Sequence, residues 1–415
     1  MTNRLYYPTS DLHEFDSVVQ EIVSPSPEQP RPGVILRETA FYPTSGGQVH
    51  DSGWLTTSAN DRVPVAEVTE TEDGRIVHYL EAPANLAPGA AVHGNIDPER
   101  RRDHMQQHSG QHVLSAAFIE LYQIPTVSFH MGEDYCSIDL TTPSLTSEQV
   151  AGAEKRANEI VFENRPVTIR FVSRDEAENL GLRKLPPAGR DELRLIEIAS
   201  FDLSACGGTH VSATGQIGSI LLRKTETVRQ GMRVEFVCGG RAVRTARRDY
   251  TALSEAAKLF STQLWDVPTQ IRKTFDDSKL LRKQREEALE QLAEAMAVAA
   301  LNQQPEARGG KVIMRLFAAH DISFAKLFAQ SVARAGSPAV ALVASTADTP
   351  GLVFAQSPGG PADMGALLKQ VLATVGGRGG GSHDFAQGGV PPGSDVEQLL
   401  KQAADAIEGQ KRAVV

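Results

Sequence analysis

Along the first 95 residues, apolar and polar positions alternate in short runs that turn-forming residues separate. Four of these runs predict β-strands, at residues 33–37, 63–68, 75–80 and 91–94. Glu72-Asp73-Gly74 supplies a tight turn between the second and third runs. Because short strands joined by turns are typical of small all-β units, this segment predicts an antiparallel barrel or sandwich.

From Asp97 the apolar spacing changes to that of an α-helix. Asp97 followed by Pro98 is the pattern of an N-cap and a first-turn proline, so a helix begins here. The same helix continues, or a new one starts, through residues 105–121, and it ends before Pro125.

A second helix is predicted over residues 146–164. Thr146 and, three residues later, Gln149 form a capping box, and the apolar residues that follow share one helix face. Strands are predicted at residues 192–198 and 218–223. This part of the chain therefore favours an α+β layer, with helices covering one face of an antiparallel sheet.

Residues 251–303 are predicted to be largely helical and carry a loose heptad repeat. Its seam consists of small or apolar residues, namely Val267, Thr274, Leu281, Ala288 and Ala295, with Leu292 and Ala299 at the companion position. An alanine-rich seam is typical of an antiparallel hairpin or of a weak dimer. We therefore expect a helical linker, and a homodimer through the C-terminal half would bury its seam.

The last part of the chain alternates strands with helices, which predicts an α/β domain. The strands are expected at 311–316, 339–345 and 351–355, and the helices at 324–335, 364–372 and 395–407. A glycine cluster at 376–389 lies between these elements. The complete prediction is an α+β protein with a β-barrel-like domain at 1–95, an α+β domain at 96–250, a helical linker at 251–305 and an α/β domain at 306–415.

The composition indicates a soluble protein. Of 415 residues, 41% are hydrophobic and 22% are charged, which excludes wholesale disorder. The longest apolar runs are far shorter than the roughly 20 residues that a bilayer helix needs, and the N-terminus lacks a secretory signal. Three cysteines are too few for a disulfide framework. We therefore expect no membrane partner and a cytoplasmic location.

The charge distribution is uneven. A net charge of −9 argues against indiscriminate binding to nucleic acid. Between Arg223 and Arg248, however, eight basic residues stand against two acidic ones. Charge alone does not decide whether this stretch is a solvated surface or a local face for RNA.

Two short motifs carry candidate metal chemistry. His108 and His112 are four residues apart on a predicted helix, so both imidazoles can reach one ion. Cys206 and His210 are also four apart, and two glycines between them allow a tight turn. Three imidazoles and a thiolate favour Zn²⁺ over Mg²⁺ or Ca²⁺. We therefore predict one zinc ion per chain, held by these four residues.

The other histidines and cysteines have simpler explanations. His104 shares the helix face of His108 and His112, but a fifth ligand would overfill a tetrahedral site. We expect His104 to support a ligand or to face solvent. Cys136 and Cys238 lie inside apolar, strand-like runs and are predicted to be core residues.

These motifs resemble those of the alanyl-tRNA synthetase editing domain and of its free-standing relatives, the alanyl-tRNA editing proteins. The resemblance rests on His108-Ser-Gly-Gln-His112, Cys206-Gly-Gly-Thr-His210-Val, the glycine-rich segment at 41–53, and the segments 127–132 and 231–242. The glycine cluster ending in Phe385-Ala-Gln-Gly-Gly resembles the C-terminal nucleic-acid-binding domain shared with DHH-type phosphoesterases.

The resemblance implies the long free-standing form, which acts in trans with no aminoacylation domain ahead of the barrel. It implies a zinc-dependent hydrolase that deacylates tRNA(Ala) mischarged with serine or glycine, spares Ala-tRNA(Ala) and needs no ATP. Two positions differ from the usual pattern: Ser45 replaces the first of three glycines, and His50 stands where glycine is usual. His50 either tunes substrate choice or is a surface substitution.

Within the glycine-rich segment, Gln48 is expected to orient water or the ester carbonyl, or else to brace the turn. Thr44 is expected to hydrogen-bond the serine hydroxyl, or else to stabilise the turn. The expected tRNA-binding residues are Arg223, Lys224, Arg229 and Arg233 in the basic stretch and Gly379, Gly380 and Gly381 in the glycine cluster.

Two other functions are open from the residues themselves. One is a tRNA-binding scaffold with a structural zinc, because four protein ligands usually describe a closed site. The other is a metallohydrolase of a small molecule, for which the basic stretch and the glycine cluster would be superfluous. Hydrolysis of Ser-tRNA(Ala) by the purified protein separates the first from an editing enzyme.

Overall fold

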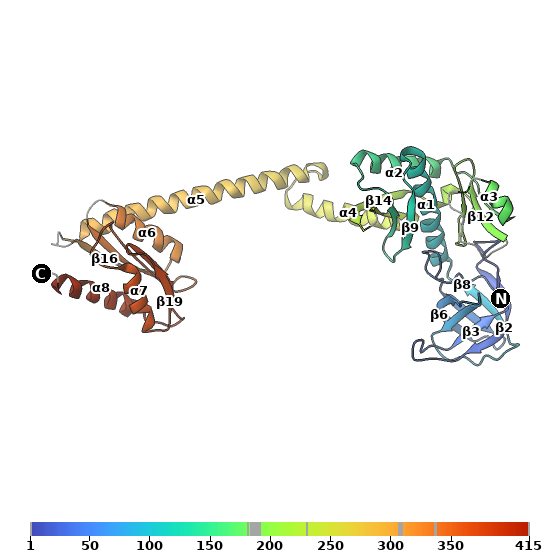
Figure 1. Cartoon of the computed structure of the whole chain (residues 1–415), viewed down its shortest axis with the longest axis horizontal. Coiled ribbons are helices and arrows are strands. Elements are labelled where there is room, and N and C mark those ends of the chain that lie inside the picture. Colours follow the sequence, from blue (N-terminus) through green and yellow to red (C-terminus); the bar gives the residue numbers. More distant parts are fainter. Residues whose placement is uncertain are drawn as a thin grey trace. The chain divides into compact units, whose positions relative to one another are not determined.

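In the computed structural model, which describes residues 2–180, 182, 192–229, 231–305, 310–335 and 338–413, six strands near the N-terminus close into a barrel (Figure 1). They are β2 (Glu14–Val23), β3 (Gly33–Leu36), β5 (Gly53–Thr57), β6 (Arg62–Glu70), β7 (Ile76–Leu80) and β8 (Ala91–Ile96), in the order β2-β3-β7-β6-β5-β8. All pairs in the barrel are antiparallel, and alternate side chains fill its interior. The four predicted strands are present, and the barrel alternative is confirmed over the sandwich.

A two-stranded parallel pair lies beside the barrel. It joins β1 (Asn3–Arg4) to β4 (Glu38–Thr39), and Leu5 continues the pairing by donating its backbone N–H to the carbonyl of Thr39. This pair fixes the position of the residues that follow Leu5.

Helix α1 (Pro98–Tyr122) is one continuous helix, which settles whether it continues or restarts. The carboxylate of Asp97 accepts hydrogen bonds from the backbone of Glu99 and Arg100, as an N-cap should. The helix ends at Gln123, whose φ of 58° is left-handed. Most of α1 is buried, including its histidines, so its polar side chains must find partners inside the protein.

Two antiparallel sheets and two helices complete this part of the chain. One sheet has the order β14-β15-β10-β9, and the other has the order β11-β12-β13. The strands are β9 (Thr126–Met131), β10 (Cys136–Leu140), β11 (Val167–Ser173), β12 (Glu192–Ile198), β13 (Asp202–Ala205), β14 (Ile220–Val228) and β15 (Gly231–Cys238). The helices are α2 (Ser147–Phe162) and the short α3 (Arg174–Asn179), with a 3-10 turn at Thr214–Ile217.

The hydrophobic core of this region lies between the helices α1 and α2 and the sheets. The capping box of Thr146 and Gln149 is present at the start of α2, and both Cys136 and Cys238 are buried in the core as predicted. The strand predicted at 218–223 begins later, at Ile220, and runs on to Val228.

Arg101 and Asp51, both fully buried, tie α1 to the glycine-rich segment. Arg101 donates to the Asp51 carboxylate and to the carbonyls of Ser10 and Ala40, and the backbone N–H of Tyr42 also donates to Asp51. Since both charges have several hydrogen-bond partners, the pair joins three segments without an unpaired charge, whereas removal of one partner would be strongly destabilising.

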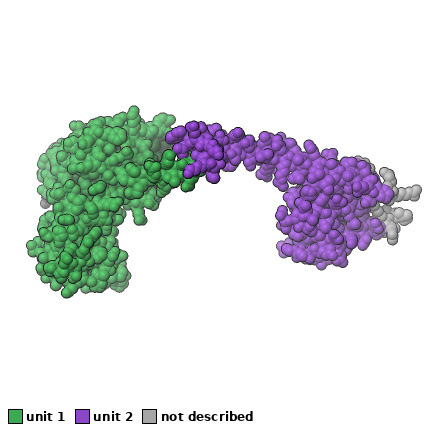
Figure 2. Space-filling view, turned by 180° about the vertical axis from the view of Figure 1, so that it is seen from behind, with its two compact units in different colours: residues 1–255 green, residues 256–415 purple. Residues whose placement is uncertain are grey.

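The chain divides into two compact units, residues 1–255 and 256–415 (Figure 2). Helix α4 (Gly239–Leu259) follows β15, and a 3-10 turn at Leu264–Asp266 precedes α5 (Val267–Gln303), so the predicted helical content is confirmed. The predicted seam is wrong as an intramolecular contact, because only its first residue, Val267, is buried. The face of α5 that packs is instead Ala293, Ala297 and Leu301, against the core around α6.

The second unit has a five-stranded sheet of order β16-β17-β18-β20-β19. Its elements are β16 (Lys311–Phe317), α6 (Ile322–Arg334), β17 (Ala339–Ser345), β18 (Gly351–Gln356), α7 (Met364–Ala373), β19 (Arg378–Gly381), β20 (Phe385–Gly389) and α8 (Val396–Ala413). Only β16 and β17 are parallel, and the other pairs are antiparallel. Separate cores on the two sheet faces, one with α5 and α6 and one with α7 and α8, make a three-layered α/β arrangement.

The glycine cluster is part of the sheet and not a connection between elements, which corrects the prediction. It forms the hairpin of β19 and β20, in which Gly379 pairs with Gly388 and Gly381 with Ala386. β19 is an edge strand, so some of its backbone N–H and C=O groups have no neighbouring strand. Among the described helices, none has the length and apolar character needed to cross a bilayer.

Candidate active site and metal centre

The glycine-rich segment makes a two-residue hairpin turn at Ser45–Gln48. Ser45 and Gln48 exchange both backbone hydrogen bonds, at 3.0 and 2.9 Å, and Gly46 and Gly47 have φ values of 58° and 83°. Two consecutive positive φ values are those of a type I′ turn, which side-chain-bearing residues rarely adopt. A Cβ on Gly47 would also lie 2.4 Å from the carbonyl oxygen of Phe129. The turn therefore needs glycine to approach β9.

The motif of Cys206 and His210, far along the chain from the glycine-rich segment, also lies close to α1. Cys206 follows β13, and the loop that it begins passes so close to α1 that a Cβ on Gly208 would lie 2.3 Å from the His108 ring. Glycine at 208 therefore allows the loop to bring Cys206 and His210 against the histidines of α1.

His108, His112, Cys206 and His210 come together as a group whose potential ligand atoms all lie within 4.8 Å of one another. The three imidazoles are buried, and Cys206 is partly exposed. The Cys206 sulfur lies 3.1 Å from Nε2 of His108 and 3.4 Å from Nε2 of His210. A single metal ion can bridge donors at such separations, and the mixture of thiolate and imidazole suits zinc.

The opposite ring nitrogens of the histidines are held by other side chains. Nδ1 of His108 donates to Oε1 of Gln48 at 2.9 Å, and Nδ1 of His112 to the carboxylate of Asp202 at 3.2 Å. The hydroxyl of Ser109 lies 3.2 Å from Nδ1 of His210. Partners of this kind fix the orientation of metal-binding imidazoles and leave Nε2 directed at the ion.

The protonation preferences also fit a metal centre. Burial alone would raise the pKa of the Cys206 thiol, but the neighbouring imidazoles of His108 and His210, with hydrogen bonds from His108 and His112, outweigh it. The pKa of Cys206 therefore lies well below its usual value. Burial lowers the pKa of His210 to about 3. A thiolate and a neutral imidazole are the forms that bind a metal.

A small cavity of about 150 Å³ opens beside His108 and Cys206. Its other walls come from β1 and the residues after it, the glycine-rich turn, the end of β6 and the Cys206 loop: Arg4, Tyr6, Tyr7, Tyr42, Pro43, Ser45, Gly46, Glu70, Gly207 and Gly208. The cavity therefore combines three tyrosine rings and the Arg4–Glu70 ion pair with two of the candidate metal ligands.

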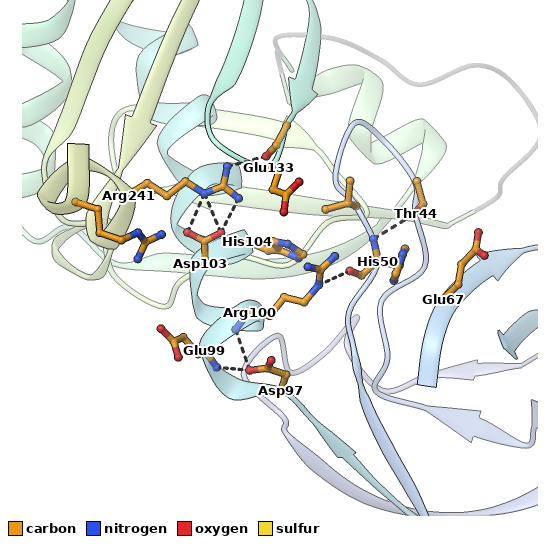
Figure 3. A pocket seen from close by; sticks show the side chains of 13 residues that line it. Thr44, His50, Glu67, Asp97, Glu99, Arg100, Asp103, His104, Glu133 and Arg241 are labelled. Carbon is orange, nitrogen blue, oxygen red and sulfur yellow. Dashed lines mark hydrogen bonds and ion pairs between the residues drawn. The ribbon is translucent and has the colours of Figure 1, made fainter. Parts of the chain in front are cut away.

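A larger cavity of about 760 Å³ also has the glycine-rich segment as a wall, through Thr44, Val49 and His50 (Figure 3). Its remaining lining is polar: Glu67, Asp97, Glu99, Arg100, Asp103, His104, Gly132, Glu133, Arg241 and Arg244. Arg241 is paired with Asp103, and Arg100 donates to the backbone carbonyl of His50 (Figure 3). Several of these charged side chains therefore already have ion-pair or hydrogen-bond partners within the protein.

The structure separates the two residues that were expected in the glycine-rich segment. Gln48 is fully buried, donates to the hydroxyl of Thr209 and accepts from the backbone of Thr209 as well as from His108. It therefore contacts a candidate metal ligand and does not line the small cavity. Thr44 is exposed, lines the larger cavity, and accepts a hydrogen bond from the backbone of His50.

Two further histidines can now be placed. His104 is 2% exposed and lines the larger cavity, so the alternative that it faces solvent is wrong. Its Nδ1 lies 3.9 Å from the Asp51 carboxylate, and burial lowers its pKa to about 4. The imidazole of His50, also in the larger cavity, lies 2.9 Å from the backbone carbonyl of Asp51.

Part of the basic stretch lines a groove of about 470 Å³. The groove has five basic side chains against three acidic ones, and the basic ones are Arg223, Lys224, Arg241, Arg244 and Arg248. Of the other two arginines expected to bind tRNA, Arg233 is paired with Asp139, and Arg229 is exposed directly after β14. The three arginines contributed by α4 lie at i, i+3 and i+7, a spacing that shares one helix face and could have identified them from the sequence.

Other residues of the site were not expected from the sequence. They are the tyrosines of the small cavity and the side chains of Asp202, Ser109 and Thr209 around the ligands. Ser109 could have been suspected, since it lies next to His108; nothing in the local sequence marks the tyrosines.

Three stretches match known protein families. Residues 9–100 match the family described as tRNA synthetases class II (A), and residues 193–234 match the threonyl and alanyl tRNA synthetase second additional domain. Residues 309–409 match the DHHA1 domain. The second match includes Cys206 and His210, and the third covers the five-stranded sheet of the second unit with α6, α7 and most of α8.

Two kinds of relative match most of this chain. The alanine–tRNA ligase of Halorubrum lacusprofundi is 32% identical over 99% of this chain but only 44% of the ligase, and that of Pyrococcus furiosus is 32% identical over 71% of this chain and 32% of the ligase. The chain thus spans less than half the length of these ligases. A solved structure, the C-Ala domain of Aquifex aeolicus alanyl-tRNA synthetase, is 20% identical over 24% of this chain, with a TM-score of 0.21.

The alanyl-tRNA editing protein AlaX-L of Pyrococcus horikoshii matches from end to end. It is 30% identical over 396 residues, which are 94% of this chain and 95% of that protein. The chain belongs to the family of alanyl-tRNA editing proteins.

Proposed function

We propose that this chain hydrolyses the aminoacyl ester of tRNA(Ala) mischarged with serine or glycine and spares Ala-tRNA(Ala). Family membership supports this function, and one structural observation carries it: three imidazoles and a low-pKa thiol converge beside a small, aromatic-walled cavity. The cavity suits an aminoacyl group, because its volume of about 150 Å³ leaves little room for a nucleoside as well. Such a substrate places the activity in the cytoplasm, where aminoacyl-tRNA is used.

The proposed cofactor is one zinc ion per chain, held by His108, His112, Cys206 and His210. The donor set fits it, because imidazole and thiolate are zinc ligands and the four potential ligand atoms lie within 4.8 Å of one another. When bound, zinc would supply a Lewis acid for the ester carbonyl or for a water molecule.

The chain's own residues prepare the site. Gln48 acts as a positioning residue, because its amide is fixed by Thr209 and in turn holds the tautomer of His108. Asp202 does the same for His112. The buried rings of Tyr6 and Tyr42 limit the water in the cavity, which strengthens polar contacts with the ester.

The groove lined by Arg223, Lys224, Arg241, Arg244 and Arg248 is the proposed tRNA contact of the first unit. Arg241 is paired with Asp103 and Arg223 with Asp249, so Arg244 and Arg248 are the arginines proposed to pair with phosphates, and such contacts make binding depend on salt. Replacing Arg244 and Arg248 by glutamate should weaken tRNA(Ala) binding and flatten its salt dependence by a slope of about two. Lys155→Glu, an exposed change on α2, is the matched control.

The second unit supplies the remaining proposed contacts. The exposed edge of β19, with Gly379, Gly380 and Gly381, can present backbone N–H groups to phosphates without side chains in the way. The seam of α5 is exposed, as at Leu281, and a homodimer through this half of the chain would cover it. Light scattering on the full-length protein measures that assembly.

The function is tested by incubating the purified, metal-loaded protein with tRNA(Ala) carrying serine, glycine or alanine. We expect the seryl and glycyl esters to be cleaved at least about tenfold faster than the alanyl ester. A protein that binds tRNA(Ala) but leaves all three esters intact would be a scaffold with a structural metal site.

A further inference from the structure

Three tyrosines form one wall of the small cavity beside the candidate metal centre. Tyr6 and Tyr7 follow strand β1, and Tyr42 comes from the glycine-rich segment. The ring of Tyr6 meets the rings of Tyr7 and Tyr42 edge to face, with both centroid distances at 5.2 Å. Tyr6 is therefore the middle ring, and its two neighbours fix its position.

The three hydroxyls differ in their hydrogen bonds. Tyr42 donates to the carbonyl of Ser45 at 3.0 Å, and Tyr7 accepts from the guanidinium of Arg4 at 2.9 Å. The hydroxyl of Tyr6 is buried, in a residue that is 1% exposed, and it has no hydrogen-bond partner among the described residues. A buried hydroxyl without a partner is unfavourable and uncommon, so it calls for a ligand.

The surroundings keep this hydroxyl available as a donor. Burial raises the pKa of Tyr6 above its ordinary value, while the charge of Arg4 and its approach to the Tyr6 hydroxyl, which falls outside hydrogen-bond geometry, oppose this effect more weakly. The Arg4 guanidinium is itself occupied by Glu70 and Tyr7. Ser45 also lines the cavity but is exposed, so water can satisfy its hydroxyl.

Choosing serine over alanine poses a particular physical problem. The larger amino acid must be accepted and the smaller one rejected, so steric exclusion cannot work. A site can instead offer a buried polar group that the serine hydroxyl satisfies and that alanine leaves unpaired. The residue expected for this task from the sequence, Thr44, is exposed and lines the other cavity.

We propose that the Tyr6 hydroxyl hydrogen-bonds the side-chain hydroxyl of the seryl ester and is the residue that distinguishes serine from alanine. This inference rests on the proposed editing function. It assigns Tyr6 to substrate recognition in the cavity that His108 and Cys206 also line.

The test compares Tyr6→Phe with wild type in the full-length, metal-loaded protein. The substitution keeps the ring and removes only the hydroxyl. We expect kcat/KM for Ser-tRNA(Ala) to fall about tenfold, while that for Gly-tRNA(Ala), which has no side-chain hydroxyl, changes by less than about twofold. Tyr79→Phe, which removes a hydroxyl from barrel strand β7, is the control and should change neither rate.

A binding experiment separates this inference from the reaction. Seryl and alanyl amides of 3′-amino-3′-deoxyadenosine cannot be hydrolysed as esters, and their affinities are measured by calorimetry. We expect wild type to prefer the seryl amide by about tenfold and Tyr6→Phe to bind the two equally, with metal content and Tm unchanged.

Several outcomes would overturn the role of Tyr6. These are an equal loss on the seryl and glycyl esters, which would indicate a structural role, a serine preference that survives in Tyr6→Phe, or wild-type protein that binds both amides equally. If wild type cleaves no ester yet Tyr6→Phe loses the preference for the seryl amide, the proposed function fails and the recognition role stands.

Discussion

Two cavities share the glycine-rich segment as a wall, and they differ in size, charge and hydrogen bonding. The larger, of about 760 Å³, is lined by three arginines and five acidic side chains, and several of these already bond to each other or to the backbone. The smaller, of about 150 Å³, has aromatic walls, a hydroxyl without a partner and the thiol and imidazole donors. Volume alone would make the larger cavity the candidate active site, whereas the unpartnered hydroxyl and the metal-binding donors favour the smaller one.

Whether the polar groups of a cavity already have partners indicates ligand binding better than the number of those groups does. In the larger cavity Asp103 pairs with Arg241 and Asp97 caps α1, so these charges stabilise the junction between the barrel and the helix. Beside the smaller cavity, the Nδ1 atoms of His108 and His112 are held by Gln48 and Asp202, and the Nε2 atoms of His108 and His210 lie near the Cys206 sulfur. Groups that are held in place but not satisfied are those that can bind a ligand.

The largest expected effect is at the centre of the smaller cavity. Cys206→Ala removes the thiolate that the imidazoles surround, so bound zinc should fall from one per chain to background, and deacylation should fall at least about a hundredfold. Tm should also fall, because the metal would join α1 to a distant loop. Elemental analysis and a deacylation assay measure both. Tightly held, stoichiometric zinc in Cys206→Ala would contradict the proposed ligand set.

The next prediction compares a buried polar residue that contacts a metal ligand with a buried polar residue that lines the larger cavity. Gln48→Ala leaves His108 without its Nδ1 partner, so metal affinity should fall about 10–100-fold. His104→Gln changes a residue on the same helix, one turn earlier, but in the larger cavity, and its metal affinity should stay within about twofold of wild type. Competition with a chelator measures both affinities. Equal losses in the two variants would mean that the cavities are not independent.

The metal ligands could be predicted from the sequence because each pair is local. The i, i+4 spacings of His108 with His112 and of Cys206 with His210 already place two donors together, and the structure brings the pairs into one group. Tyr6 could not be found in this way. It reaches the cavity because β1 pairs with β4, and hydrophobic periodicity within a two-residue strand carries no information.

The misplaced features have a similar cause. The spacing of small and apolar residues predicts the heptad positions of α5, but burial is set by α6, whose Phe324 and Phe328 share a core with Ala293 and Ala297. Likewise, the glycine cluster looks like a loop in isolation, and it becomes strands because β18 offers β20 a paired edge. Tertiary contacts override local pattern in both cases.

The third prediction concerns pH and the larger cavity. The pKa of His104 is lowered from 6.5 to about 4 by burial, so between these values the unfolded chain binds a proton that the folded chain does not. Stability from this residue is complete above pH 6.5 and is lost as the pH falls toward 4; at about pH 5 the loss is about 2 kcal/mol. Between about pH 7.5 and 5, wild type should lose about 2 kcal/mol more unfolding free energy than His104→Gln, measured by urea titration. Parallel curves would show that His104 is not held neutral.

The smallest expected effect is at Thr44, and it tests which cavity receives the amino acid. Thr44→Val keeps the shape of the side chain and removes a hydroxyl that is exposed and bonded to the backbone of His50. Water can replace that bond, so deacylation of the seryl, glycyl and alanyl esters should each change by less than about twofold. Tyr6→Phe, assayed beside it, should lose the seryl rate alone. A serine-selective loss in Thr44→Val would return recognition to the larger cavity, and an equal loss on all esters would show that the hydroxyl supports the glycine turn and through it Gln48.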